Sequence, residues 1–208
     1  MSSAQQIDHP LVAHHVTQLR DRDTPSPIFR QRVQQLTYLL AYEATRDLPL
    51  ETAVVQTPLA ECEGRRLSGR IAILPILRAG LGMEDAVLDL IPRAEVWHLG
   101  VYRDEQTLEP VEYYHKLPTD DPPAVAFILD PMLATGGSAT AAANALKRWG
   151  VADIRLLSLI AAPEGIDNLA RSHPDVRVFV AAIDQCLNAA GFIVPGLGDA
   201  GDRIFSTR

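Results

Sequence analysis

A stretch of small and hydroxyl-bearing residues in the middle of the chain has the composition of a phosphate-binding loop. It follows an apolar run, Val125–Leu129, and precedes an expected helix over Ala139–Trp149. A helix start exposes unpaired backbone N–H groups and the positive end of the helix dipole, and glycines let an anion approach the backbone closely. The pattern therefore favours a site for a phosphate monoester. The stretch reads Asp130, Pro131, Met132, Leu133, Ala134, Thr135, Gly136, Gly137 and Ser138.

Asp130 adds a second chemical requirement at the end of the expected strand. Its carboxylate could accept hydrogen bonds from two neighbouring hydroxyls, which a ribose 5-phosphate offers. The alternative is a tight strand-to-helix turn in which Asp130 only caps the helix. The chain lacks the Gly-x-x-x-x-Gly-Lys pattern of nucleoside triphosphatases and the Gly-x-Gly-x-x-Gly pattern of dinucleotide-binding proteins.

Two further strand ends carry cationic residues. Pro75–Gly82 contains Arg78 among small residues, which favours a second anion site, although a solvent-exposed arginine at a helix entry would also fit. Gly100–Lys116 is long, charged and contains Arg103. Loops of this length in compact domains are usually functional or disordered. The segment could close over a site as an arm, or it could be an exposed hairpin or an oligomer contact.

Near the end of the chain, Gly191–Asp202 contains four glycines. We expect no regular element there, and such a segment lets main chain pass close to a ligand. The alternative is an ordered C-terminal loop with capping aspartates.

Short apolar runs alternate with amphipathic stretches over most of the chain, which predicts an α/β fold with a parallel sheet of about five strands flanked by helices. Ligands of such sheets bind beyond the carboxyl ends of the strands, where the candidate loops lie. The expected strands are Ile71–Leu74, Val96–Leu99, Val125–Leu129, Ile154–Ile160 and Val176–Val180, and the expected helices are Met83–Ile91, Ala139–Trp149 and Glu164–Arg171.

One domain over residues 1–208 accounts for the whole pattern. Apolar spacings of three and four predict N-terminal helices over about 1–50. The core would span about 53–182, beginning with a strand at Ala53–Thr57 and a turn or hairpin at Glu61–Gly69. A C-terminal segment of about 183–208 completes the domain.

Three motifs resemble those of the type I phosphoribosyltransferases, and in particular of the uracil branch. Ile128–Asp130 with Ala134–Ser138 resembles the loop that binds 5-phosphoribosyl pyrophosphate (PRPP). Most of that superfamily has a second acidic residue where this chain has Pro131, and proline is the form of the uracil branch. Pro75–Gly82 is similar to the uracil branch as well, and Ile193–Asp202 resembles its uracil-binding signature.

The resemblance implies a role for each candidate residue. Arg78 would meet the pyrophosphate of PRPP, and Arg103 would contact PRPP from a mobile flap. The loop from Asp130 to Ser138 would bind the ribose and its phosphate, and Asp199 would lie on the PRPP side. The residues with catalytic roles would be Asp130, Arg103 and Asp199, and those that bind uracil, largely through main-chain groups, would be Ile193, Gly198, Asp199 and Ala200.

The implied reaction transfers the phosphoribosyl group from PRPP to uracil, giving UMP and pyrophosphate. Mg²⁺ would be held mainly through PRPP and water, without protein ligands of its own. Family members are homo-oligomers and some are activated by GTP, but no motif here decides regulation. Two alternatives stay open: a phosphoribosyltransferase for another nucleobase, and a PRPP-sensing regulator without turnover.

Bulk composition fits this interpretation. The net charge of −7 argues against general nucleic-acid binding, which needs a basic surface. No apolar run is long enough to span a membrane, the first residues lack the pattern of a secretion signal, and the 208 residues include only two cysteines. We therefore expect a cytoplasmic protein without membrane partners.

Overall fold

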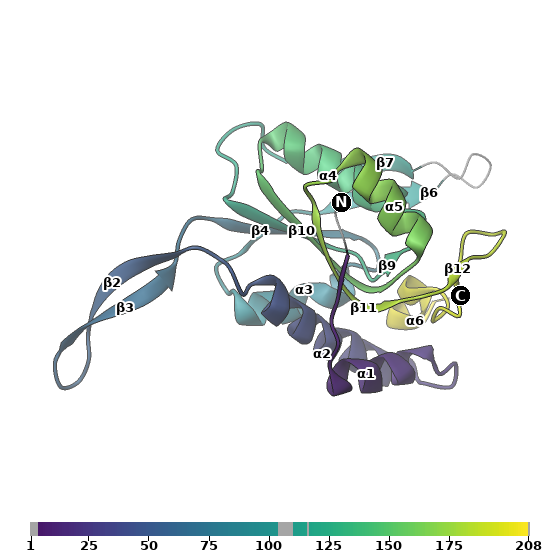
Figure 1. The fold of residues 1–208 in the computed structure, drawn as a ribbon, viewed down its shortest axis with the longest axis horizontal. Helices are drawn as coiled ribbons and strands as arrows, with labels where there is room; N and C mark the ends of the chain where they lie inside the picture. Colours follow the sequence, from purple (N-terminus) through teal and green to yellow (C-terminus); the bar gives the residue numbers. More distant parts are fainter. Residues whose placement is uncertain (1–3, 104–109, 116, 208) are drawn as a thin grey trace.

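The computed structural model describes residues 4–103, 110–115 and 117–207 and shows a central sheet covered by helices on both faces (Figure 1). The strands of the sheet follow the order β1-β11-β10-β8-β4-β6-β7, all pairing in parallel except the antiparallel β6–β7 pair. These strands are β1 (Gln5–Gln6), β4 (Ile71–Leu77), β6 (Leu99–Arg103), β7 (Pro110–His115), β8 (Val125–Leu129), β10 (Asp153–Ala161) and β11 (Arg177–Ile183).

The central strands are apolar throughout because both of their faces are covered. All five residues of β8 are buried, as are the first six of β4. Alternate side chains enter two separate hydrophobic clusters, one on each face of the sheet. This confirms the predicted α/β class with a mostly parallel sheet.

Helices of the described residues pack on both faces of the sheet, each layer against its own hydrophobic cluster (Figure 1). The first layer contains α1 (Pro10–Arg20), α2 (Ser26–Ala44), α3 (Leu81–Leu90) and α6 (Ala200–Phe205). The second contains α4 (Gly137–Trp149) and α5 (Pro163–Ser172). Pro25 is the N-cap of α2 and Pro27 lies in its first turn, where a proline has no backbone N–H to leave unpaired. None of the helices in the described residues is long and apolar enough to cross a membrane.

Several elements differ from the sequence expectations. The run at Val96–Leu99 is divided between β5 (Glu95–Val96) and β6, because residues 97 and 98 leave the ladder between them. The strand β1 was not predicted, since two residues are too few for a periodic signal. The glycine-rich C-terminal stretch is more regular than expected, because it contains β13 (Ile193–Val194), paired with β12 (Cys186–Leu187), and the start of α6.

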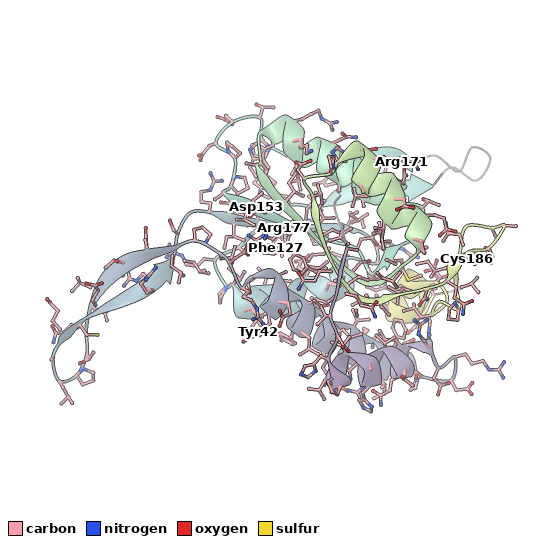
Figure 2. All side chains as sticks on the ribbon, viewed as in Figure 1. Tyr42, Phe127, Asp153, Arg171, Arg177 and Cys186 are labelled. Atoms are coloured by element: carbon pink, nitrogen blue, oxygen red, sulfur yellow. The ribbon has the colours of Figure 1, made fainter. Side chains whose placement is uncertain are left out.

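A two-stranded hairpin extends from the body of the molecule. It consists of β2 (Leu50–Gln56) and β3 (Glu61–Leu67), which pair antiparallel with each other and not with the central sheet. The hairpin itself projects away from the sheet and helices (Figure 2). Glu61–Gly69, predicted as a turn or hairpin region, is thus mostly the second strand of this hairpin.

Candidate active site

The candidate loops meet where the order of the strands reverses. From β4 the chain passes through α3 to β6 on one side, and from β8 it passes through α4 to β10 on the other. Because α3 and α4 cover opposite faces of the sheet, the loops after the neighbouring strands β4 and β8 separate at the carboxyl edge. Such a switch point is where open α/β sheets bind ligands.

The loop after β8 forms a small cradle at the start of α4. Gly136 is the N-cap of this helix and has a φ of +81°, and a Cβ there would lie 2.7 Å from the carbonyl oxygen of Gly165. Both constraints require glycine. The hollow has a volume of about 30 Å³ and is lined by Asp130, Met132, Leu133, Ala134, Thr135, Gly136, Gly137, Ser138 and Ala139.

Residues outside the motif fix the shape of this cradle. The hydroxyl of Ser158 accepts a hydrogen bond from the N–H of Leu133 at 3.1 Å, and the side-chain amide of Asn168 donates to the carbonyl of Thr135 at 2.8 Å. Sequence reasoning missed both residues. Ser158 had a signal, since it is a polar residue inside a buried apolar strand, whereas Asn168 on an amphipathic helix had none.

Asp130 stands at the junction of the cradle and the larger cavity. Burial raises the pKa of its carboxyl from the ordinary 3.8 to about 6, and a hydrogen bond from the N–H of Met132 at 3.3 Å opposes this only in part. Among the described residues no cation pairs with this carboxylate. Apart from the bond from Met132, its acceptor capacity is therefore open to hydroxyls of a ligand.

Arg78 lies just beyond the end of β4. Its side chain is 57% exposed, and Nη2 donates to Oδ1 of Asp202 at 3.2 Å. The hydroxyl of Thr207 donates to the same oxygen at 2.7 Å. The guanidinium is thus oriented by one contact while most of it faces open space, as a cation that binds an anionic ligand requires.

The glycine-rich segment forms the opposite wall. Asp199 is the N-cap of α6, with Oδ1 accepting from the N–H of Asp202 at 2.9 Å, so the capping role considered as the alternative is present, and Asp199 also lines the cavity described below. Gly196 has a φ of +65°, and a Cβ there would lie 2.2 Å from the carbonyl oxygen of Ile193. The main chain therefore turns sharply between Ile193 and Gly198.

One cavity of about 330 Å³ connects these three segments. The predicted residues that line it are Arg78, Asp130, Met132, Ala134, Ser138, Ile193, Gly198, Asp199 and Ala200. Phe192 also lines it and was not predicted, although an aromatic residue beside the signature was a possible signal. Pro131 is buried and lines neither hollow; its carbonyl accepts hydrogen bonds from the N–H groups of Leu159 and Ile160. The side chain of Arg103 lies outside the described residues.

The described part of the chain contains no cluster of three histidine, cysteine or acidic residues arranged to hold a metal. Asp130 and Asp199 nevertheless supply carboxylate oxygens at the cavity. Such hard oxygen ligands suit Mg²⁺ that keeps most of its water and ligand oxygens.

Comparison with known proteins identifies the family. The family model described as uracil phosphoribosyltransferase matches residues 6–207. The uracil phosphoribosyltransferase of Roseiflexus sp. (strain RS-1) is 58% identical over 199 residues, covering 96% of each chain, and that of Brevibacillus brevis is 52% identical over the full length of both. The solved structure of the AQ2163 protein from Aquifex aeolicus superposes with a TM-score of 0.93 at 37% identity, covering 98% of each chain. The chain belongs to the uracil phosphoribosyltransferase family.

Proposed function

We propose that this protein transfers the 5-phosphoribosyl group of PRPP to uracil, producing UMP and pyrophosphate. The observation that carries the proposal is the single cavity in which a phosphate cradle, an exposed arginine and a glycine-rich segment meet. These three parts match the three parts of the reacting complex: a ribose phosphate, a pyrophosphate and a small planar base.

In this reaction the bond between the anomeric carbon and the pyrophosphate oxygen breaks, and a bond from that carbon to N1 of uracil forms. Positive charge develops on the sugar as the leaving group departs. The cradle would fix the 5-phosphate, Asp130 would accept hydrogen bonds from the ribose hydroxyls, and Arg78 and Arg103 would stabilise the pyrophosphate. Preorganised charges of this kind contribute most of the rate in many enzymes. The N1 proton would pass to water or to the departing pyrophosphate as that bond forms, and no residue among those that line the cavity stands out as an obligatory general base.

Mg²⁺ is the proposed cofactor, bound with PRPP. It would neutralise charge on the pyrophosphate while keeping waters as ligands, and Asp130 and Asp199 are the carboxylates that could contact it or its waters. Removal of Mg²⁺ with a chelator should abolish turnover, and its restoration should recover it.

We also propose that the protein is a homo-oligomer. The β2–β3 hairpin exposes apolar side chains, among them Leu59 at 96% and Val54 at 62%, and an isolated two-stranded hairpin is marginally stable. A second copy would cover these residues. Light scattering would test this, and a monomer at micromolar concentration would contradict it. Activation by GTP stays a prediction.

The experiment that tests the function is a turnover assay with PRPP, Mg²⁺ and a panel of bases. Uracil presents acceptor, donor and acceptor at O2, N3 and O4, whereas cytosine inverts the last two. Sites that hydrogen-bond an edge of the substrate reject mismatched analogues by about 10⁴–10⁵. We expect uracil and 5-fluorouracil to react and cytosine, hypoxanthine and guanine to fail. Turnover of a purine would indicate another base specificity, and PRPP binding without turnover of any base would indicate a sensor.

A further inference from the structure

An ion pair next to the glycine-rich segment joins Arg20, the last residue of α1, to Asp184, the residue after β11. Arg20 binds Asp184 through both guanidinium Nη atoms, with Nη1 donating to Oδ2 at 2.9 Å. The side chain of Asp184 is 2% exposed and that of Arg20 is 26% exposed. Neither residue is among those that line the cavity.

The two side chains of this ion pair hydrogen-bond both the N–H and the carbonyl oxygen of one residue in the glycine-rich segment, Gly196. Oδ2 of Asp184 accepts from the N–H of Gly196 at 2.9 Å, and Nη1 of Arg20 donates to the carbonyl oxygen of Gly196 at 2.9 Å. Gly196 is at the sharp turn between Ile193 and Gly198. The pair therefore fixes the position and the orientation of the turn.

The pair is itself anchored to the central sheet. The N–H of Asp184 donates to the carbonyl oxygen of Ala161, the last residue of β10, at 2.8 Å. A continuous set of contacts thus runs from the carboxyl edge of the sheet through Asp184 to Gly196, within three residues of Ile193 and two of Gly198.

Rigid placement matters more for main-chain recognition than for recognition by side chains. A side chain can change rotamer to restore a hydrogen bond, but a main-chain N–H or C=O moves only with its peptide. A site that reads uracil through main-chain groups therefore depends on whatever holds those peptides in place.

We propose that Arg20 and Asp184 are positioning residues for base recognition, which set the affinity for uracil by holding the turn at Gly196. This inference rests on the proposed function. Since the contacts to the base are made in both the ground state and the transition state, their loss should raise KM for uracil more than it lowers kcat.

Three variants test the inference. Arg20→Met leaves a buried carboxylate without its cation and will lower stability as well. The double variant Arg20→Met/Asp184→Asn removes that charge and is the variant chosen to stay folded. Arg20→Lys keeps the charge but lacks the planar fork that reaches both Asp184 and Gly196. Arg177→Met is the matched control, because it removes a partly exposed arginine from an ion-pair network that does not contact the glycine-rich segment.

In the folded variants we expect KM for uracil to rise by up to on the order of 100-fold, the loss that a small misplacement of site groups can cause. KM for PRPP and kcat at saturating uracil should change little, and the preference for uracil over cytosine should weaken. Arg20→Lys should give an intermediate KM. Arg177→Met should lower the melting temperature and leave KM for uracil unchanged.

An unchanged KM for uracil in the folded double variant would overturn the inference and make the pair a structural anchor. Equal losses with PRPP and with uracil would overturn it too, since the effect would then not be specific to the base. Failure of the proposed function is a separate result, because it would be seen in the parent protein as an absence of UMP formation.

Discussion

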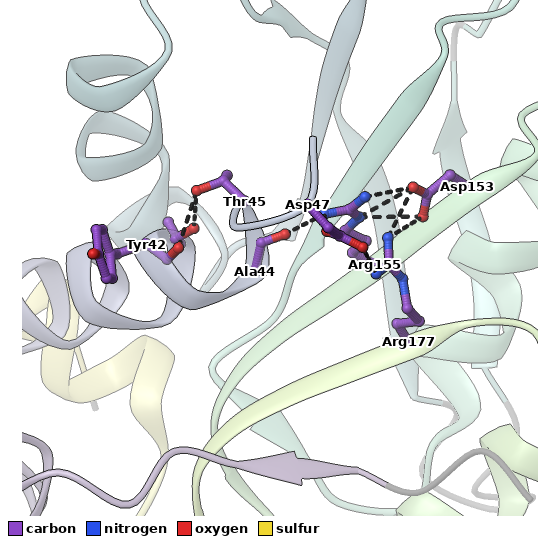
Figure 3. A network of polar contacts seen from close by, with 8 residues as sticks. Tyr42, Ala44, Thr45, Asp47, Asp153, Arg155 and Arg177 are labelled. Atoms are coloured by element: carbon purple, nitrogen blue, oxygen red, sulfur yellow. Dashed lines mark hydrogen bonds and ion pairs between the residues drawn. The ribbon is translucent and has the colours of Figure 1, made fainter. Parts of the chain in front are cut away.

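The charged residues at the amino ends of the central strands are more fully paired than Asp130 and Arg78, which line the cavity beyond the carboxyl ends. At the amino ends, Arg155 and Arg177 each bind both Asp47 and Asp153 (Figure 3). At the carboxyl ends, Asp130 accepts one long backbone hydrogen bond among the described residues and Arg78 makes one ion pair. In Figure 2, Asp153 and Arg177 lie at one end of the sheet and Cys186 lies near the other.

The pKa values follow the same division. Burial alone would raise the pKa of Asp153, but hydrogen bonds from Arg155 and Arg177 outweigh it and lower the pKa below its ordinary value. For Asp130, burial has no comparable opposition, and the pKa rises to about 6. The charged groups of the Arg155–Arg177 network neutralise one another. The charged form of Asp130, in contrast, has no cationic partner among the described residues and destabilises the protein until a ligand binds.

The largest expected effect at the carboxyl ends is that of Gly137→Val. Gly137 is the first residue of α4 and lines the cradle, but the positive φ belongs to Gly136, so valine at 137 should fill the phosphate position without straining the turn. Losing two charge-assisted hydrogen bonds, at about 1.5–3 kcal/mol each, would weaken PRPP binding by about 100-fold or more. Calorimetric titration with PRPP measures this.

The control is Asn144→Val, a substitution at an exposed position on the same helix, and this variant should bind PRPP normally. Normal PRPP binding by folded Gly137→Val would show that the phosphate does not bind in this loop.

At the amino ends we expect the reverse result: lost stability with intact kinetics. Arg155 is 1% exposed, and beyond its ion pairs it donates to the carbonyl of Ala44 at the end of α2 and stacks over the ring of Phe127. Removing one partner of such a network costs about 3–5 kcal/mol. Chemical denaturation of Arg155→Met should show this loss with both KM values unchanged. Arg22→Met, at a side chain 93% exposed, should stay within about 0.5 kcal/mol of the parent. A raised KM or a lowered kcat in folded Arg155→Met would contradict the claim that the charged residues at the amino ends contribute only to stability.

Local patterns in the sequence predicted the sheet and the three segments of the site because each is encoded in consecutive residues. An apolar run of five predicts a buried strand such as β8, and a loop after it must lie at the carboxyl edge. The ion pairs were not predictable in this way. Arg155 and Asp47 are 108 positions apart, and Arg20 and Asp184 are 164 apart, so only the fold brings them together. No local period encodes such a pairing.

Asp130→Asn should weaken the use of PRPP by a smaller amount. The amide keeps the shape but loses the charge and half of the acceptor capacity. Each charge-assisted hydrogen bond to a ribose hydroxyl should contribute about 1.5–3 kcal/mol. The loss in kcat/KM should be smaller with a 2-deoxyribose analogue of PRPP, which already lacks one hydroxyl. Equal losses with both sugars would show that Asp130 does not contact the diol.

Asp130→Asn should also raise the free energy of unfolding of the ligand-free protein. We expect this gain at neutral and higher pH, where the carboxyl of the parent is charged, and not at low pH. The raised pKa means that the native state binds a proton more tightly than the unfolded chain between pH 3.8 and about 6. Stability contributed by this group is therefore complete at low pH and falls as the pH rises through that window. With a pKa of about 6 in the native state, the charged carboxylate destabilises the native protein by at most about 3 kcal/mol at pH 8. Asparagine carries no charge at any pH, so the difference in unfolding free energy between Asp130→Asn and the parent should be positive at pH 8 and shrink toward pH 4. Denaturant titrations of both proteins at the two values of pH measure it, and the other titrating groups cancel in the comparison. A difference that does not depend on pH would mean that the pKa of Asp130 is not raised and that the protein alone stabilises its carboxylate. Asp130 would then not differ from the paired aspartates at the amino ends of the strands.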